Sequence, residues 1–256
     1  MPPLPALRGL EIGTPPLPPG RRHGWDVHAF SRPARTFTGD FYLTRRGGGS
    51  LWLALGDVAG KGLPAAVFMA MIQEKLEELL DGCASRSLRP AQALRHLNEF
   101  LLAQLPANRF ATAVVARLSA DGALEIANAG HCVPLIRRRE GSLQGIAPTG
   151  PVLGILADPQ WTAVRTRLRA TETLLLYSDG LVEAPSGRAE EFGMGRIRSL
   201  LAGAAASDAR GIAGKMVKAA EEHAGGTRHD DLTVVVAQRP AGPSLLRSGL
   251  GRGSAA

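Results

Sequence analysis

The chain has 256 residues, of which 45% are hydrophobic and 21% charged, and a folded chain of this size buries enough surface for a full core without disulfides or a structural metal. Thirty Lys and Arg residues against 23 Asp and Glu residues give a net charge of +7, which raises nucleic acid as a partner. The hydrophobic content excludes a mostly disordered chain. The basic residues are scattered and lack interleaved aromatic residues, so the composition does not favour nucleic-acid binding.

The chain is predicted to form one domain between two poorly ordered ends. Residues 1–22 are rich in proline, and residues 240–256 are rich in Gly, Ser and Arg. Such compositions are typical of extended segments that do not pack into a core. No internal repeat or long linker interrupts residues 23–239, so we assign this whole stretch to a single domain.

Strand and helix signals follow one another in groups along this domain. Stretches rich in Val, Leu, Thr and aromatic residues predict strands at 25–30, 50–58, 111–118, 123–130, 133–138, 173–180 and 231–238. Apolar residues that recur every three or four positions predict helices at 64–80, 90–104, 194–201 and 209–223. Strands in groups with helices between them favour an α+β fold with largely antiparallel sheets, because a doubly wound sheet alternates strand and helix. A hairpin is expected between residues 111–118 and 123–130.

Cysteine content and apolar runs bear on the compartment. The longest apolar stretch, residues 63–72, is far shorter than the roughly 20 residues of a membrane span, and the first residues do not form an export signal. Two cysteines, Cys83 and Cys132, are too few and too far apart for a disulfide framework or a CxxC metal site. We therefore expect a cytoplasmic protein without a membrane span, whose two thiols are free.

Four acidic sites stand next to the ends of apolar segments, namely Asp40, Asp57, Asp179 and the pair Asp230-Asp231. A single aspartate beside glycine is often only a turn residue. A fold that brought all four sites together, however, would gather negative charge that requires a cation. Carboxylates without nearby His or Cys pairs favour magnesium or manganese, and two such ions that share a carboxylate form a site for in-line attack on phosphorus.

The segment DVAGKGLPAA, residues 57–66, is the most specific in the chain. It passes from a strand through a glycine turn into a helix with Pro64 at its first position. A Walker A loop has four residues between its glycines and Ser or Thr after its lysine, and neither feature is present here. A dinucleotide fingerprint would require an acidic strand end about 20 residues later, which is also missing. Neither nucleotide-binding motif is therefore assigned.

Taken in order, these segments resemble the SpoIIE-type (RsbU-like) serine phosphatases, a branch of the PPM metal-dependent protein phosphatases. The resemblance extends over about residues 25–238. The chain departs from the family's pattern at Thr38, Leu43 and Cys132, which leaves room for altered metal affinity but removes no expected ligand. The matching segments are TGDFY (38–42), GDVAGKGLPAA (56–66), LN (97–98), FATA (110–113), NAGH (128–131), PVLG (151–154), LLYSDGLVEA (175–184), FG (192–193) and DDLTV (230–234).

The resemblance implies an αββα sandwich, in which helices flank two antiparallel sheets and two ions, Mn²⁺ or Mg²⁺, lie between the sheets at one end. Carried over by position, Asp57 corresponds to the carboxylate that bridges both metals, and the Val58 carbonyl corresponds to a ligand of the second. Asp179 and Asp230 correspond to ligands of the first metal. Asp40 corresponds to an aspartate that reaches the metals directly or through water.

In the reaction that the resemblance implies, a metal-bridging water attacks phosphoserine or phosphothreonine in line and no phosphoenzyme forms. Arg35, five residues before Asp40, matches by spacing an arginine that binds substrate phosphate, and the simpler alternative is a surface arginine. Lys61 either steadies the glycine turn or meets the phosphate. His131 has either a structural role in a turn between strands or the role of general acid. Asp231 is the weaker ligand candidate beside its neighbour.

The resemblance thus implies a protein serine/threonine phosphatase with Asp57, Asp179 and Asp230 as its catalytic residues. Its implied substrate is a phosphorylated signalling partner of the anti-sigma-factor antagonist type in a partner-switching pathway. A basic surface would help to attract an acidic phosphoprotein. Two alternatives are kept: a catalytically weak module of the same fold that binds a signalling partner, and a small-molecule phosphoesterase that uses the same metals. The sequence is compatible with a homodimer.

Overall fold

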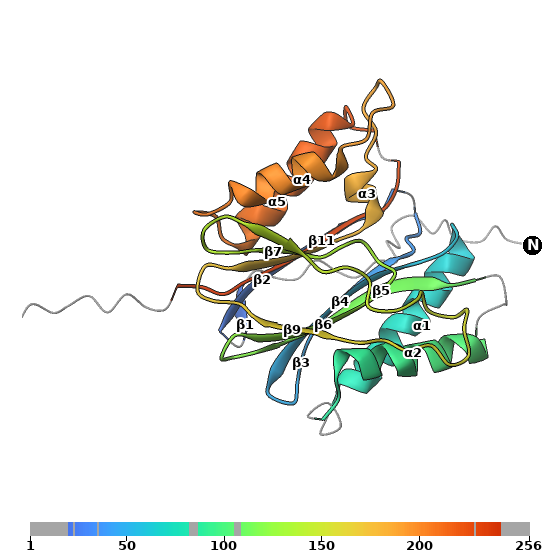
Figure 1. Ribbon diagram of the computed structural model, residues 1–256. Coiled ribbons are helices and arrows are strands. Elements are labelled where there is room, and N and C mark those ends of the chain that lie inside the picture. Colours follow the sequence, from blue (N-terminus) through green and yellow to red (C-terminus); the bar gives the residue numbers. More distant parts are fainter. Residues whose placement is uncertain are drawn as a thin grey trace, which may run out of the picture.

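The computed structural model describes residues 20–22, 24–34, 36–81, 87–104, 109–227 and 229–241. Two antiparallel sheets pack face to face, and a layer of helices covers the outer side of each sheet (Figure 1). This four-layer arrangement buries the apolar face of every helix and both faces of the central strands. The predicted α+β class and αββα sandwich are confirmed.

The two sheets contain eleven strands within the described residues, and every neighbouring pair is antiparallel. The six-stranded sheet has the order β1 (Gly20–Arg22), β2 (Trp25–Arg32), β11 (Leu232–Gln238), β10 (Thr173–Tyr177), β7 (Leu135–Arg137) and β8 (Leu143–Gly145). The five-stranded sheet has the order β3 (Asp40–Gly47), β4 (Ser50–Val58), β5 (Ala111–Ser119), β6 (Ala123–Ala129) and β9 (Val164–Arg167).

Each helical layer packs on one sheet. The first layer, on the five-stranded sheet, consists of α1 (Leu63–Leu80) and α2 (Pro90–Gln104). The second, on the six-stranded sheet, consists of α3 (Asp179–Val182), α4 (Gly193–Ala202) and α5 (Ala209–His223). The buried residues of the longer helices recur at intervals of three and four, as the apolar periodicity predicts.

Three hydrophobic clusters correspond to the three contacts between the four layers. The middle cluster fills the space between the sheets, with Trp25, Tyr42 and Leu53 among its members. The outer clusters join each helical layer to its sheet. Strand β4 supplies side chains to both faces and is buried along its length except at Asp57, which is only partly buried. The one polar side chain at the end of this strand therefore faces a gap at the edge of the core.

The structure corrects the predicted elements at several places. The sequence patterns do not predict β1, β3, β8 and β9, which are the four edge strands of the two sheets. Asp40 therefore begins a strand, whereas it was expected near the end of one. The strand predicted at 173–180 ends at Tyr177, because a short helix begins at Asp179 with Ser178 at its N-cap position. The strand predicted at 133–138 is reduced to Leu135–Arg137.

Other predictions are confirmed or fall outside the described residues. The expected hairpin forms between β5 and β6, with Ala113 opposite Ala129. Cys132 carries a free thiol, while Cys83 lies outside the described residues. Across the described ranges, no helix combines the length and apolar character needed to cross a bilayer.

Candidate functional site

The edge strand β3 places Asp40 directly opposite Asp57. These two residues are partners in the antiparallel register of β3 and β4. Asp40 is 3% exposed, and its Oδ2 accepts a hydrogen bond of 2.6 Å from the Thr233 hydroxyl. Burial, followed by the nearby charge of Asp57, raises the pKa of Asp40 well above its usual value. Asp40 is thus the more deeply buried of these two neighbouring carboxylates.

The second sheet brings Asp179 close to Asp230. Tyr177 pairs with Val234 in the antiparallel strands β10 and β11, so the residue that follows β10 and those that precede β11 lie at the same end. Gly180 allows this approach, because a β-carbon there would lie 2.0 Å from the backbone oxygen of Asp231. The absence of a side chain at Gly180 therefore allows the segments that carry Asp179 and Asp230 to lie next to each other.

Four aspartates line one pocket between the ends of the two sheets, although they come from three distant parts of the chain. The pocket has a volume of about 220 Å³, and its walls include Asp57, Asp179, Asp230, Asp231 and Lys61. Burial, followed by the charges of the other three aspartates, raises the pKa of Asp57 to about 7. The pKa of Asp179 is also raised, by burial and then by the charge of Asp230. Negative charge therefore accumulates here beyond what the surrounding residues compensate.

Lys61 supplies a positive charge at the rim of this pocket. Its Nζ lies 3.4 Å from Oδ2 of Asp230, and both side chains are largely exposed. An exposed ion pair of this length contributes little to stability. Lys61 is thus available to contact a negatively charged group in the pocket.

The space beside Gly39 suits a cation. A β-carbon at Gly39 would lie 2.6 Å from Oδ1 of Asp57 and 3.0 Å from the backbone oxygen of Val58. A carboxylate and a carbonyl oxygen therefore flank one point that is open only because residue 39 is glycine. These hard oxygen donors, next to uncompensated negative charge, fit magnesium or manganese.

The ligand set is nevertheless not fully gathered. In the part of the chain that the structure describes, no three His, Cys, Asp or Glu side chains converge as a ready metal-binding group. The aspartates line one pocket without forming such a group. The donor chemistry fits a divalent cation, and the predicted roles of the individual ligands stay predictions.

Asp231 holds the loop that precedes β3. Its Oδ1 accepts a hydrogen bond of 2.7 Å from the backbone N–H of Ala34, and its Oδ2 accepts one of 3.0 Å from Gly39. Both carboxylate oxygens are thus engaged with backbone donors. This arrangement favours a positioning role for Asp231 and leaves Asp230 the better ligand candidate of the pair. Arg35 belongs to the same loop and lies outside the described residues.

His131 lies in the turn between β6 and β7, as the sequence predicts, and is 6% exposed. Its Nδ1 is 2.8 Å from the Thr112 hydroxyl, and its backbone N–H donates a hydrogen bond of 2.8 Å to Asn128. Its buried Nε2 has no hydrogen-bond partner among the described residues. His131 and Thr112 line a second pocket together with Asp57 and Asp179. The imidazole is therefore held rigidly beside the acidic residues.

Burial lowers the pKa of His131 to about 4. We expect its imidazole to stay neutral from about pH 8 to about pH 5, because the folded chain resists protonation below the usual pKa of about 6.5. Stability associated with the neutral ring is then present above pH 6.5 and is lost as the pH falls towards 4. An NMR titration of the ring protons, with the urea-unfolded chain as reference, tests this. A folded-state midpoint between about 6 and 7 would contradict it.

The departures from the family's pattern have separate structural explanations. Leu43 packs in the cluster between the helices and the five-stranded sheet. The Thr38 hydroxyl accepts a hydrogen bond of 3.0 Å from the backbone N–H of Asp40. Burial, followed by the charge of Asp179, raises the pKa of Cys132 to about 12, so its thiol stays protonated at neutral pH.

The structure adds Arg109, which the sequence motifs do not single out. Its Nη1 donates a hydrogen bond of 2.7 Å to the carbonyl of Ala59. The same guanidinium fills the space beside Gly60, where a β-carbon would lie 1.6 Å from it. Arg109 thus supports the glycine turn that follows Asp57. In the sequence, only the position of Arg109 directly before the FATA segment could have indicated this supporting role.

Comparison with protein families gives one match over most of the chain. Residues 47–240 match the family described as Stage II sporulation protein E (SpoIIE). The phosphoserine phosphatase RsbU of Bacillus subtilis (strain 168) is 30% identical over 160 residues, which are 62% of this chain and 47% of RsbU. The chain therefore spans about half the length of this curated relative.

Solved structures show the same fold. The SiaA-PP2C domain of Pseudomonas aeruginosa superposes with a TM-score of 0.73 at 20% identity, over 84% of this chain and 86% of that one. The RsbU and RsbW domains of Rv1364c from Mycobacterium tuberculosis give a TM-score of 0.71 at 26% identity, over 88% of this chain and 63% of that one. The sandwich and its topology therefore recur in PP2C-type domains.

Proposed function

Because this chain belongs to the SpoIIE family of PPM-type phosphatases, we propose that it is a protein serine/threonine phosphatase whose acidic pocket holds divalent cations. One observation carries the proposal. Asp57, Asp179 and Asp230 reach the same pocket from three distant segments, and burial together with the neighbouring aspartate charges raises the pKa of Asp57 to about 7. Such a concentration of carboxylates near the ends of the strands suits metal-assisted hydrolysis of a phosphate ester.

The proposed metals are two ions of Mn²⁺ or Mg²⁺. Asp57 would bridge them, the Val58 carbonyl would bind the second ion, and Asp179 and Asp230 would bind the first. Asp40, opposite Asp57 in the strand register, would bind the metal ions directly or through a water molecule. The serine/threonine phosphatase PstP, of similar fold, was solved in complex with two manganese ions, and RsbX with magnesium. When bound, such ions polarise the phosphate and lower the pKa of a water molecule.

The remaining site residues bind and orient the substrate in this proposal. Lys61, at the rim of the pocket, would bind a phosphate oxygen. Arg35 is proposed as the second residue that binds the phosphate, because it lies five residues before Asp40 in the sequence. His131 is proposed to contact the substrate as a neutral ring that can donate or accept one hydrogen bond. It would not act as an imidazolium acid at neutral pH.

We propose a phosphorylated signalling protein of the anti-sigma-factor antagonist type as the substrate, acting in the cytoplasm. Two relatives support a partner-switching role: the phosphoserine phosphatase RsbU, and the chain of Rv1364c that contains both RsbU and RsbW domains. The net charge of +7 would favour an acidic partner. Self-association as a homodimer is compatible with this role.

The proposal is tested by hydrolysis of p-nitrophenyl phosphate by the purified chain, with and without manganese or magnesium and with a chelator. We expect turnover that requires the added metal, because the carboxylates need a cation to neutralise them. Phosphoserine peptides and nucleotides are then compared as substrates. Metal-independent turnover would contradict the proposed chemistry, and a preference for nucleotides would favour a small-molecule phosphoesterase. Metal binding by calorimetry without any turnover would favour a binding module.

A further inference from the structure

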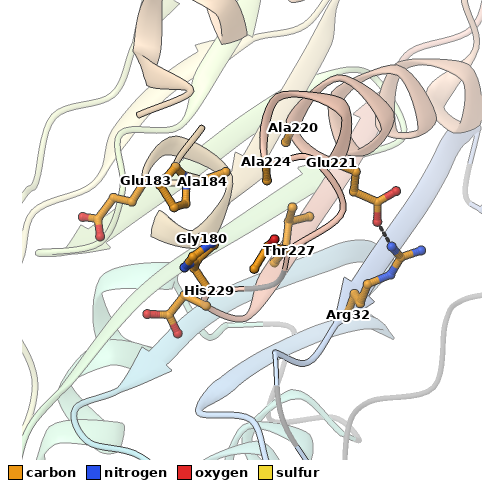
Figure 2. Close-up of a pocket in the computed structure, with 12 residues that line it drawn as sticks. Arg32, Gly180, Glu183, Ala184, Ala220, Glu221, Ala224, Thr227 and His229 are labelled. Carbon is orange, nitrogen blue, oxygen red and sulfur yellow. Dashed lines mark ion pairs between the residues drawn. The ribbon is translucent and has the colours of Figure 1, made fainter. Parts of the chain in front are cut away.

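A third cavity, distinct from the acidic pocket and from the pocket beside His131, lies at the second helical layer (Figure 2). Ala184 after α3, Ala220 and Ala224 at the end of α5, and Leu232 at the start of β11 contribute to its walls, and most of its surface is apolar. Ala220 and Ala224 are one helical turn apart and so lie on the same face of the chain. Small side chains at these positions leave the cavity open.

The size of this cavity limits what it can hold. Its volume is about 50 Å³. By the same measure one water molecule requires roughly 10–15 Å³, so there is room for about four groups of that size. This corresponds to the four heavy atoms of a Leu, Ile or Met side chain. A nucleotide base or a second helix would not fit.

Two charged residues at the edge of the cavity neutralise each other. Arg32 forms an ion pair with Glu221 on one side (Figure 2). Arg32 also lies over the Phe30 ring, 5.2 Å from its centroid. Most of the cavity surface is nevertheless apolar, although the carboxylates of Glu183 and Asp230 also line it, and this apolar part favours an uncharged alkyl group.

The cavity shares two wall residues with the acidic pocket. His229 and Asp230 line both, and both residues are exposed. Glu183 lies at the same cavity, on the side of α3 (Figure 2). A peptide with its phosphate among the aspartates would place a neighbouring side chain here. Because the two pockets share wall residues and an extended chain advances roughly 3.3–3.6 Å per residue, that side chain would lie near the phosphoserine in the peptide sequence.

We propose that this cavity is a specificity pocket that takes one Leu-, Ile- or Met-sized side chain of the phosphoprotein, within about three residues of the phosphorylated serine. The inference rests on the proposed function and specifies its substrate class. The acidic pocket recognises the phosphate, which every substrate shares, whereas the apolar cavity distinguishes one phosphoprotein from another. Burial of the alkyl group supplies the preference.

The test uses short phosphoserine peptides of otherwise alanine sequence, with one leucine moved through the three positions on either side. With manganese present, we expect leucine at one position to raise kcat/KM at least about tenfold over the all-alanine peptide. Ala224→Leu fills the cavity and should reduce this preference to less than about twofold, while hydrolysis of p-nitrophenyl phosphate stays within about twofold of wild type. Thr227→Leu, at an exposed wall position, provides a second filling variant should Ala224→Leu fail to fold.

Ala206→Leu is the matched control, since it makes the same change at an exposed position between α4 and α5. It should keep the leucine preference. No preference at any position, or a preference that survives both filling variants, would overturn the proposal. An equal loss of activity on the leucine peptide and on p-nitrophenyl phosphate would also overturn it, because filling the cavity would then disturb the acidic pocket itself. If wild type does not hydrolyse p-nitrophenyl phosphate, the proposed function fails separately, and anisotropy binding of the same peptides still tests the cavity.

Discussion

Replacement of Asp57 by asparagine is expected to lower metal-dependent kcat by about 1000-fold or more, while the metal-free chain becomes no less stable. The carboxylate is the proposed bridge between two cations, and loss of several kcal/mol of charge stabilisation corresponds to this factor. Burial and three neighbouring aspartates raise the pKa of Asp57 to about 7, so its ionised form destabilises the fold near neutral pH. The neutral amide removes this repulsion and keeps the shape of the side chain.

The measurement combines steady-state hydrolysis of p-nitrophenyl phosphate with urea unfolding in the presence of a chelator. Asp158→Asn removes one negative charge at an exposed site away from the pocket and serves as the control. It should leave both activity and the free energy of unfolding unchanged. Near wild-type turnover by Asp57→Asn would show that this carboxylate does not bridge metals. A large loss of stability would show that Asp57 has a structural role instead.

The positions of the acidic residues could be predicted because each stands at the boundary of an apolar segment. Asp57 ends the apolar run of β4, and Asp230 precedes that of β11. Such boundaries lie at the ends of the sheets wherever the strands pair. The sequence could not show that the strand order would bring β4 and β10 to the same side, because that order depends on pairing between residues far apart in the chain.

The four strands that the sequence patterns miss are all edge strands, and this follows from their environment. β9 reads VRTR and alternates between half-buried and exposed positions, and β3 carries Arg45 and Arg46 in its second half, before Gly47. An edge strand has solvent on one side and commonly carries charged residues, so it lacks the continuous apolar run of β4. The omission affected the site, because β3 is the strand that sets Asp40 opposite Asp57.

The apolar cavity could not be predicted either, for a different reason. Its walls contain Ala184, Ala220 and Ala224, and alanine in a helix or turn is ordinary in any sequence. What makes these residues a pocket is the fold, which brings the segment after α3 and the end of α5 to the walls of one cavity. A cavity leaves no recognisable pattern in the sequence, whereas an aspartate beside a glycine at the end of an apolar segment is such a pattern.

Replacement of Gly39 by alanine is expected to lower activity by about 100-fold or more with only a small effect on stability. Gly39 does not have a positive φ, so alanine meets no backbone strain. Its β-carbon would lie 2.6 Å from Oδ1 of Asp57, so that carboxylate must turn away, at a cost of about 1 kcal/mol or less. The methyl group would also occupy the space that the Val58 oxygen faces. Displacement of a reacting group by about 1 Å costs on the order of 100-fold.

Two readouts, kcat and the affinity for manganese by calorimetry, separate this effect from general damage to the fold. Gly187→Ala is the matched control, because a β-carbon there meets nothing within 4 Å, and it should behave as wild type. We expect Gly39→Ala to weaken manganese binding and to lower kcat together, since one methyl group disturbs both oxygen donors. Full activity in Gly39→Ala would mean that the cation is bound elsewhere in the pocket. Asp179 and Asp230, which line the same pocket, would then hold it without the Val58 carbonyl.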